Sequence, residues 1–157
     1  METRKPIVYI VDDDKDLRTS LAWLLESVSV QAQCFAGAEE FLSQYDPRQP
    51  ACLVLDVRMP ETSGFQLQEI LNQRGSSLPT IFVSAHGDIP MSVTAMKNGA
   101  LDFVEKPYNP QQMIDRIQTA LKTAVHAQAD QAQRQHMQGK LALLTARERE
   151  VLMLVID

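Results

Sequence analysis

Cysteine is scarce in this sequence, and the two residues present, Cys34 and Cys52, form no Cys-x-x-Cys pair. Both lie inside apolar runs. We therefore expect two buried free thiols in a reducing compartment. The scarcity argues against a disulfide framework and against a cysteine metal site.

Long hydrophobic runs and an excess of positive charge are also missing. No stretch approaches the ~18 apolar residues that a membrane-spanning helix needs, and no basic-then-apolar leader opens the chain. Fifteen Lys and Arg residues stand against twenty Asp and Glu, which gives a net charge of −5. This balance disfavours a nucleic-acid backbone as partner for the segment as a whole. We expect a soluble protein of the cytoplasm.

What the sequence does contain is an alternation of short β-branched runs with segments of helical period. The expected strands cover residues 7–11, 31–35, 52–55, 80–83 and 102–105. Apolar stripes mark helices between and after them: Leu17, Leu21, Leu24, Leu25 and Val28; Phe65, Leu67, Ile70 and Leu71; Val93, Met96 and the stem of Lys97; Met113, Ile114, Ile117 and Leu121. Five repeats of a strand and a helix predict an α/β domain whose parallel sheet is covered on both faces.

Polar residues follow four of the expected strands. Asp12 and Asp13 end the first strand, Asp56 the third and Ser84 the fourth, and Lys106 follows the fifth. Because ligands of such sheets bind at the carboxyl ends of the strands, we expect these side chains on one rim.

This set of side chains suits phosphoryl transfer to a carboxylate. Two carboxylates can hold Mg²⁺, a hard ion that prefers oxygen ligands, and the third is then free to act as a nucleophile. The ammonium group of Lys106 and the hydroxyl of Ser84 can neutralise oxygens of the incoming group. Taken singly, each residue has a simpler interpretation, and for Asp14 we prefer the simpler one, a helix cap.

The ordered motifs resemble the receiver domains of bacterial two-component response regulators. The resemblance covers residues 7 to about 122 and rests on VDDD, on LDVRMP and on SAHGDIPMSVTAMKNGALDFVEKPY, with intervals of 43, 28 and 22 residues between Asp13, Asp56, Ser84 and Lys106. The last motif looks like the FixJ-type subfamily. The resemblance implies a flavodoxin-like (βα)5 fold with a five-stranded parallel sheet of strand order 2-1-3-4-5, followed by a helical linker.

The resemblance also implies a role for each matching residue. It implies that Asp56 is the phospho-acceptor. Mg²⁺, or Mn²⁺ in its place, would be bound directly by Asp13, largely through water by Asp12, and by the Arg58 carbonyl as a further ligand. Ser84, the Ala85 backbone amide and Lys106 would surround the phosphate, and a cis Lys106–Pro107 bond would aim the lysine. Phe103 stands where many receivers have a switch tyrosine, so its ring can swing but cannot donate a hydrogen bond.

The same resemblance implies partners and a readout. A sensor histidine kinase would supply the phosphoryl group, and the chain would catalyse only its own phosphorylation and dephosphorylation. Phosphorylation is expected to cause dimerisation through the fourth helix, fifth strand and fifth helix, at residues 89–98, 102–105 and 110–121.

Beyond the receiver (1–123), residues 124–140 are rich in Ala and Gln, as expected of a helical linker, with disorder as the alternative. In residues 141–157, Thr145 and Glu148 form a T-x-x-E capping box before an apolar run. This segment resembles the first helix of a LuxR-type helix-turn-helix domain, so we expect a truncated output domain. Without a recognition helix, promoter DNA is an expected partner only of a full-length protein.

Two other classes stay open at this point. An aspartate-nucleophile phosphatase of the haloacid dehalogenase type also has a D-x-D at its first strand, which Asp12 and Asp14 match, but Asp16 departs from the Thr or Val found two residues later. A flavodoxin-like mononucleotide module would share the fold, yet no Gly-rich loop follows the first strand.

Overall fold

A computed structural model of the chain describes the backbone of residues 5–85 and 89–143 and the side chains of residues 5–85 and 90–126. The elements are β1 (Ile7–Val11), α1 (Lys15–Glu26), β2 (Gln31–Phe35), α2 (Ala38–Gln44), β3 (Ala51–Asp56), α3 (Gly64–Gln73), β4 (Thr80–Ser84), α4 (Ile89–Lys97), β5 (Asp102–Glu105) and α5 (Pro110–Leu143). Strand and helix alternate five times, as the sequence predicts.

The five strands form one parallel sheet of order β2-β1-β3-β4-β5. The expected α/β class and strand order are therefore confirmed. The central strand β3 is buried along its whole length, whereas the edge strand β2 buries only its last residue, Phe35. Such a buried parallel sheet needs helices on both faces.

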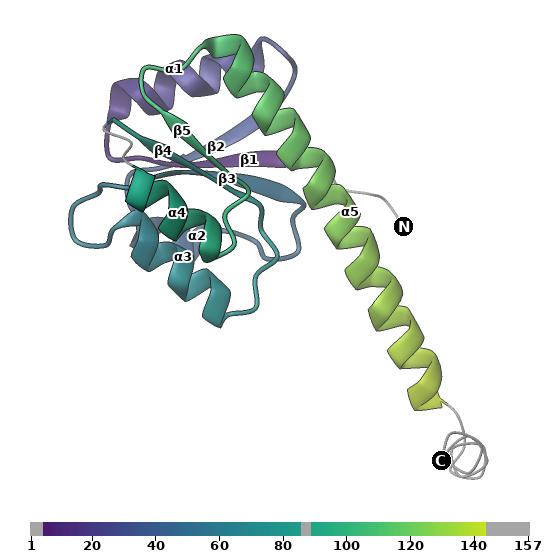
Figure 1. Ribbon diagram of the computed structural model, residues 1–157. Helices are drawn as coiled ribbons and strands as arrows, with labels where there is room; N and C mark the ends of the chain where they lie inside the picture. Colours follow the sequence, from purple (N-terminus) through teal and green to yellow (C-terminus); the bar gives the residue numbers. More distant parts are fainter. Residues whose placement is uncertain (1–4, 86–88, 144–157) are drawn as a thin grey trace. The chain divides into compact units, whose positions relative to one another are not determined.

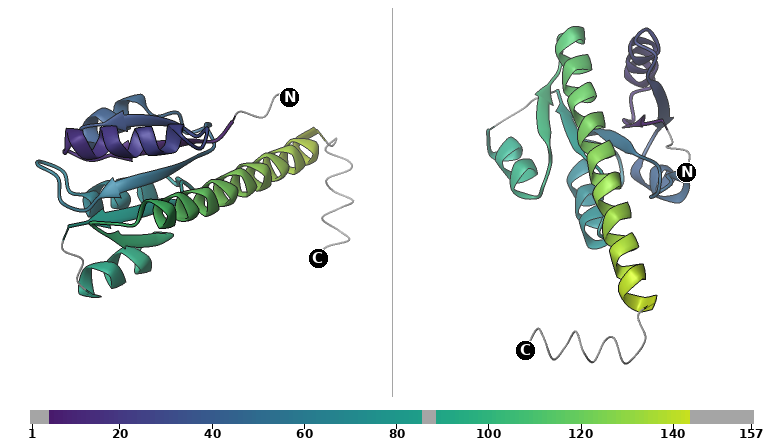
Figure 2. Two further views of the ribbon diagram at one scale, coloured as in Figure 1. Left: turned by 90° about the horizontal axis from the view of Figure 1, so that it is seen from above. Right: turned by 90° about the vertical axis from the view of Figure 1, so that its right-hand side faces the viewer.

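Helices cover the two faces of the sheet in two groups (Figure 1). Against one face, α1 and the first turns of α5 pack through a core that includes Leu21, Leu25, Met113 and Ile117. The other face carries α2, α3 and α4, with Phe41, Leu67 and Ala95 among the buried residues. The right-hand view in Figure 2 shows α1 and α4 at opposite edges of the sheet, next to β2 and β5 respectively.

The expected stripe of α4 is wrong in direction. Val93 and Met96 are 43% and 48% exposed, Lys97 is also exposed, and Ala95 is the residue buried against the sheet. In this nine-residue helix Ala95 is buried in the core, and Met91 packs, partly buried, against the same core. Val28, expected in the first stripe, lies beyond the end of α1 and is also exposed.

The two cysteines are both free, but only one is buried. Cys52 on β3 is fully buried, and burial raises the pKa of its thiol to about 12. Cys34, expected to be buried, is exposed because it lies on the edge strand, where one side of the sheet has no further strand.

Contacts divide the chain into two compact units, Met1–Val125 and His126–Asp157. The predicted linker, 124–140, lies within α5, which is one helix to Leu143. Most of the predicted output-domain segment, including its capping box, lies outside the described residues. In the part of the chain that the structure describes, no helix is long and apolar enough to cross a membrane.

Candidate functional site

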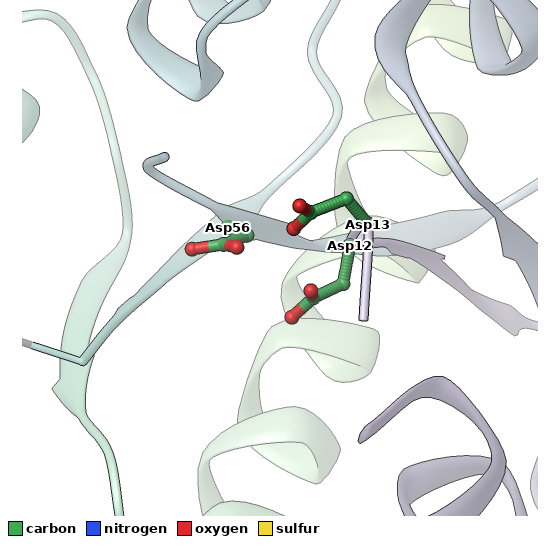
Figure 3. Close-up of side chains that lie close together, drawn as sticks. All are labelled: Asp12, Asp13 and Asp56. Carbon is green, nitrogen blue, oxygen red and sulfur yellow. The ribbon is translucent and has the colours of Figure 1, made fainter. Parts of the chain in front are cut away.

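Three carboxylates meet where β1 and β3 end (Figure 3). One carboxylate oxygen from each of Asp12, Asp13 and Asp56 lies within 4.8 Å of the others. Asp12 and Asp56 are buried, at 2% and 7% exposure, while Asp13 is exposed. The structure thus brings together the acidic residues that the sequence placed on one rim.

The segment after β1 is held by hydrogen bonds to the backbone and side chain of Asp12. The Asp12 N–H donates to the carbonyl of Phe35 at 3.2 Å, and the Asp14 N–H donates to Asp12 Oδ1 at 2.9 Å. Arg18, on the first turn of α1, donates from Nη1 to the Asp12 carbonyl at 2.6 Å. These bonds fix the direction in which the first carboxylate leaves the sheet.

Asp14 points away from this role and caps α1. Its Oδ1 accepts from the backbone N–H groups of Asp16 and Leu17, at 3.0 and 3.3 Å. The preferred interpretation of Asp14 as a helix cap is therefore confirmed. Asp14 is also the second aspartate of the phosphatase-like D-x-D pattern, and its side chain is engaged in this cap.

Asp56 is the last residue of β3, and the start of α3 packs tightly against its backbone. The Arg58 N–H donates to Asp56 Oδ1 at 3.3 Å, and the Gly64 N–H donates to the Val57 carbonyl at 2.9 Å. A Cβ at Gly64 would lie 2.3 Å from the Asp56 carbonyl oxygen. Only glycine allows this approach, so Gly64 helps to set the position of the carboxylate.

Lys106 supplies the positive charge nearest to the carboxylates. Its Nζ lies 3.1 Å from Asp12 Oδ2 and 3.8 Å from Asp56 Oδ2. Its backbone N–H donates to the Ser84 carbonyl at 2.8 Å, which holds it beside the end of β4. The Lys106–Pro107 bond is cis, as the resemblance to receiver domains implies. The ammonium group pairs with two of the three carboxylates, so among the described residues the cluster keeps an excess of negative charge.

That excess charge shows in the acid–base behaviour of Asp56. The pKa of its carboxyl is raised to about 6; burial is the largest cause and the charges of Asp12 and Asp13 act in the same direction, while Lys106 and the Arg58 N–H act in the opposite direction. Desolvation and like charge both disfavour an anion, so they act together here.

The remaining expected residues lie on the neighbouring strands. Ser84 ends β4 and is buried, at 1% exposure, and Ala85 follows it in an exposed bend. In the register of the sheet Ser84 pairs with Glu105, the residue before Lys106. Phe103, on β5, is half-buried, with its ring centroid 6.5 Å from that of Phe82. Arg58 is exposed directly after β3.

The donor set fits a hard divalent cation. All three side chains offer oxygen, which Mg²⁺ prefers, and two of them are buried anions that a cation would neutralise. The exposed Asp13 keeps one side of the cluster open to solvent, as suits an ion that retains water ligands.

Sequence reasoning missed Arg18 and Gly64. An arginine on the first turn of a helix is usually a solvated side chain, so no local pattern marks its bond to Asp12. Gly64 could have been found, because a lone glycine that opens an apolar helix just after a site loop suggests a close backbone approach.

Comparison with known proteins gives one consistent result. Residues 8–118 match the family model described as the response regulator receiver domain. The chain is 39% identical over 157 residues to the response regulator protein TmoT of Ectopseudomonas mendocina, covering all of this chain and 71% of that protein. It is 37% identical over 150 residues to the transcriptional regulatory protein FixJ of Azorhizobium caulinodans, covering 96% of this chain and 71% of FixJ.

Solved structures agree. The response regulator StyR superposes with a TM-score of 0.89 at 41% identity, over 97% of this chain and 77% of that one. None of these comparisons supports the phosphatase alternative.

Proposed function

We propose, from the premise that this chain belongs to the response regulator receiver family, that Asp56 accepts a phosphoryl group from the phosphohistidine of a sensor histidine kinase. The observation that carries this proposal is the position of Asp56, a buried carboxylate within 3.8 Å of a lysine ammonium and beside two further acids. The chain then has no substrate to turn over besides its own phosphoryl group, so it is a signalling protein and not a metabolic enzyme.

In the transfer step, an oxygen of Asp56 forms the new bond to phosphorus while the bond from phosphorus to the histidine nitrogen breaks. The imidazole leaves with the electron pair of that bond. Asp56 must be ionised to attack, and with a pKa of about 6 it is mostly ionised at neutral pH. Lys106 lies between Asp12 and Asp56, where its ammonium can pair with an oxygen of the incoming group.

Asp12, Asp13, Asp56 and the Arg58 carbonyl would hold Mg²⁺, or Mn²⁺ in its place. When bound, the ion would supply positive charge to the oxygens of the transferring group. The chain's own residues do the positioning: Arg18 and the Asp14 N–H hold Asp12, and Gly64 allows α3 to pack against Asp56. Ser84 and the Ala85 amide would bind phosphate oxygens after transfer.

Phosphorylation is read out, we propose, as dimerisation through α4, β5 and α5. Movement of Ser84 and Lys106 toward the new phosphoryl group would shift the segments that follow them, and Phe103 would change its packing between buried and exposed positions. Val93, Met96 and Leu101 expose apolar surface on and just after α4. Such apolar exposure supports an interaction surface there.

A full-length protein would use the dimer to control transcription. FixJ is named as a transcriptional regulatory protein, and the last residues of the present chain resemble the start of a LuxR-type helix-turn-helix domain. A dimer would bring two such domains to paired promoter half-sites, which a single recognition helix cannot span. The proposed location is the cytoplasm, where a sensor kinase presents its phosphohistidine.

The test is a mass measurement after incubation with Mg²⁺ and a small acyl phosphate. We expect the mass to rise by one phosphoryl group in the wild-type chain and in Glu69→Gln, which removes an exposed carboxylate from α3. Asp56→Asn should show no increase. Equal modification of Asp56→Asn, or none in a folded wild-type chain, contradicts the assignment.

A further inference from the structure

Two side-chain amides of α3 bind the end of α4. Gln68 donates from Nε2 to the Ala95 carbonyl at 3.1 Å, and Asn72, one turn later on α3, donates from Nδ2 to the Asn98 carbonyl at 2.8 Å. The first of these hydrogen bonds is buried and the second is exposed. Both accepting carbonyls lie in the last turn of α4 or just after it, where a helix leaves carbonyls without intrahelical donors. We call this pair of hydrogen bonds the amide clasp.

Side-chain packing at this end of α4 is sparse within the part of the chain that the structure describes. Between residues 93 and 98 only Ala95 is buried, and Met91, which packs partly buried against the same core, lies one turn earlier. The segment 99–101 that follows lines a cavity of about 270 Å³ together with the turn 76–79. The position of this helix end therefore depends on hydrogen bonds more than on apolar contacts.

The amide of Gln68 is satisfied on one side only. Its side chain is buried, at 4% exposure, and Oε1 has no hydrogen-bond partner among the described residues. The Ala95 carbonyl sets the orientation of the amide, because turning Oε1 toward it would place two acceptors together. An unpaired buried acceptor costs free energy, which offsets the gain from the one bond that Gln68 makes. Gln68 therefore joins two helices while adding little to the stability of the whole fold.

A substitution can separate these two effects. Gln68→Met keeps the length of the side chain and removes both the bond to Ala95 and the unpaired oxygen. The Ala95 carbonyl still accepts from the Ala100 N–H at 3.0 Å, so it keeps a donor. We expect the stability of the whole fold to stay the same or rise, while the connection between α3 and α4 weakens.

We propose that the amide clasp holds α4 in its resting position and so restrains dimerisation until Asp56 is phosphorylated, an inference that rests on the proposed function. Val93 and Met96, which the proposed dimer would bury, lie on the helix whose end the clasp binds, and Leu101 follows that helix. A change in the position of α4 relative to α3 stretches these bonds. The free energy of the clasp thus counts against the dimer-forming arrangement, and removing the clasp shifts the population toward it without phosphorylation.

Hydrogen exchange of the unphosphorylated full chain tests the clasp itself. In Gln68→Met we expect the backbone amides of residues 98–101 to exchange about fivefold faster, the loss of roughly one hydrogen bond, while the amides of β1 and β3 exchange no faster than in the wild type. Gln73→Met makes the same change at an exposed position of α3 and should exchange as wild type. A residue that served only the core would instead quicken exchange in the strands.

A second variant, at an exposed position, keeps the test valid if Gln68→Met folds poorly. Asn72→Asp replaces the amide donor with a carboxylate that repels the Asn98 carbonyl, and should quicken exchange in the same amides. Gln73→Glu adds the same charge one residue later without removing a clasp bond, so it is the matched control.

Light scattering of the unphosphorylated chain tests the restraint on dimerisation. Both chains of a dimer must release α4, so a shift of about fivefold in each raises the association constant about 25-fold. Gln68→Met added to Asp56→Asn should give the same rise over Asp56→Asn alone, because no phosphoryl group is involved. The inference is overturned if exchange at residues 98–101 is unchanged in both clasp variants, or if it quickens while the association constant stays that of the wild type. A wild type that stays monomeric after confirmed phosphorylation contradicts the proposed function, and the exchange result does not depend on that measurement.

Discussion

Replacing Asp56 with Asn should stabilise the fold in the absence of divalent cations, by an amount that depends on pH. The carboxyl has its pKa raised from an ordinary 3.8 to about 6 by burial and by the neighbouring acids. At 1.36 kcal/mol per pH unit, this difference is worth about 3 kcal/mol of folded-state destabilisation once the group is ionised in both states. Asn carries no charge and keeps an oxygen that can accept from the Arg58 N–H.

The sign of the pH dependence follows from the raised pKa. Below about pH 3 the carboxyl is mostly protonated in both the folded and the unfolded chain, so Asp and Asn should differ little. As the pH rises, the unfolded chain loses its proton first, and the folded state of the wild type becomes less favourable until the pH passes about 6. The gain from Asp56→Asn should be about half of its full value at pH 5 and constant above pH 7.

Urea unfolding at several pH values, with a chelator present, measures this gain. Circular dichroism is the better probe, because the single tryptophan, Trp23, is 69% exposed and its surroundings change little on unfolding. Glu69→Gln is the matched control, since it makes the same change in net charge at an exposed position. A gain no larger than that of the control, or one that does not grow between pH 4 and 7, would refute the reasoning.

Three further predictions follow from the same site and surface. Mg²⁺ at tenfold above its dissociation constant should raise the free energy of unfolding by about 1.4 kcal/mol, measured by urea unfolding, and Asp13→Ala should abolish the effect; a wild type indifferent to Mg²⁺ would count against the cation site. Gly64→Ala should lower the free energy of unfolding by about 1–3 kcal/mol, because the new Cβ would lie 2.3 Å from the Asp56 carbonyl oxygen. The control Gly37→Ala, whose Cβ would have no atom within 4 Å, should change the free energy of unfolding little in the same experiment. After acyl phosphate treatment, light scattering should give about twice the chain mass of 17.6 kDa in the wild type and a monomer in Asp56→Asn; a monomer despite confirmed phosphorylation would contradict dimerisation of this segment.

The fold could be predicted from the sequence because its signals are local and repeated. The strands β1, β3 and β4 are short runs rich in β-branched or other apolar residues, and three of the five predicted strands have the observed bounds. The acidic cluster was also predictable, since a parallel sheet brings the carboxyl ends of its strands to one edge, and Asp12, Asp13 and Asp56 end neighbouring strands. Predicting the fold and the acidic cluster required only the order of strands and helices along the chain, and no knowledge of how their side chains pack.

The contacts that sequence reasoning missed depend on distances between elements. No periodic sequence pattern predicts the hydrogen bond from Arg18 to the Asp12 carbonyl or the close approach of Gly64 to Asp56. The expected burial of Cys34 assumed an apolar run, although Gln33 directly precedes it, and the exposure of a strand residue also depends on whether another strand lies beside it. Whether a strand lies at the edge depends on the strand order of the whole sheet, so a local sequence pattern cannot predict it.

The error at α4 is of a different kind and bears on function. Val93 and Met96 were expected to face the core because they repeat at helical spacing, yet they are among the large apolar side chains that the described chain exposes. Apolar spacing predicts a face that is removed from water, and it does not say whether the same chain or a second copy removes it. The exposed Leu101 lies just after the same helix, so the apolar surface extends past α4. The proposed dimer would bury these side chains after phosphorylation, and the stripe would then have the same physical cause as a core stripe, supplied by a partner.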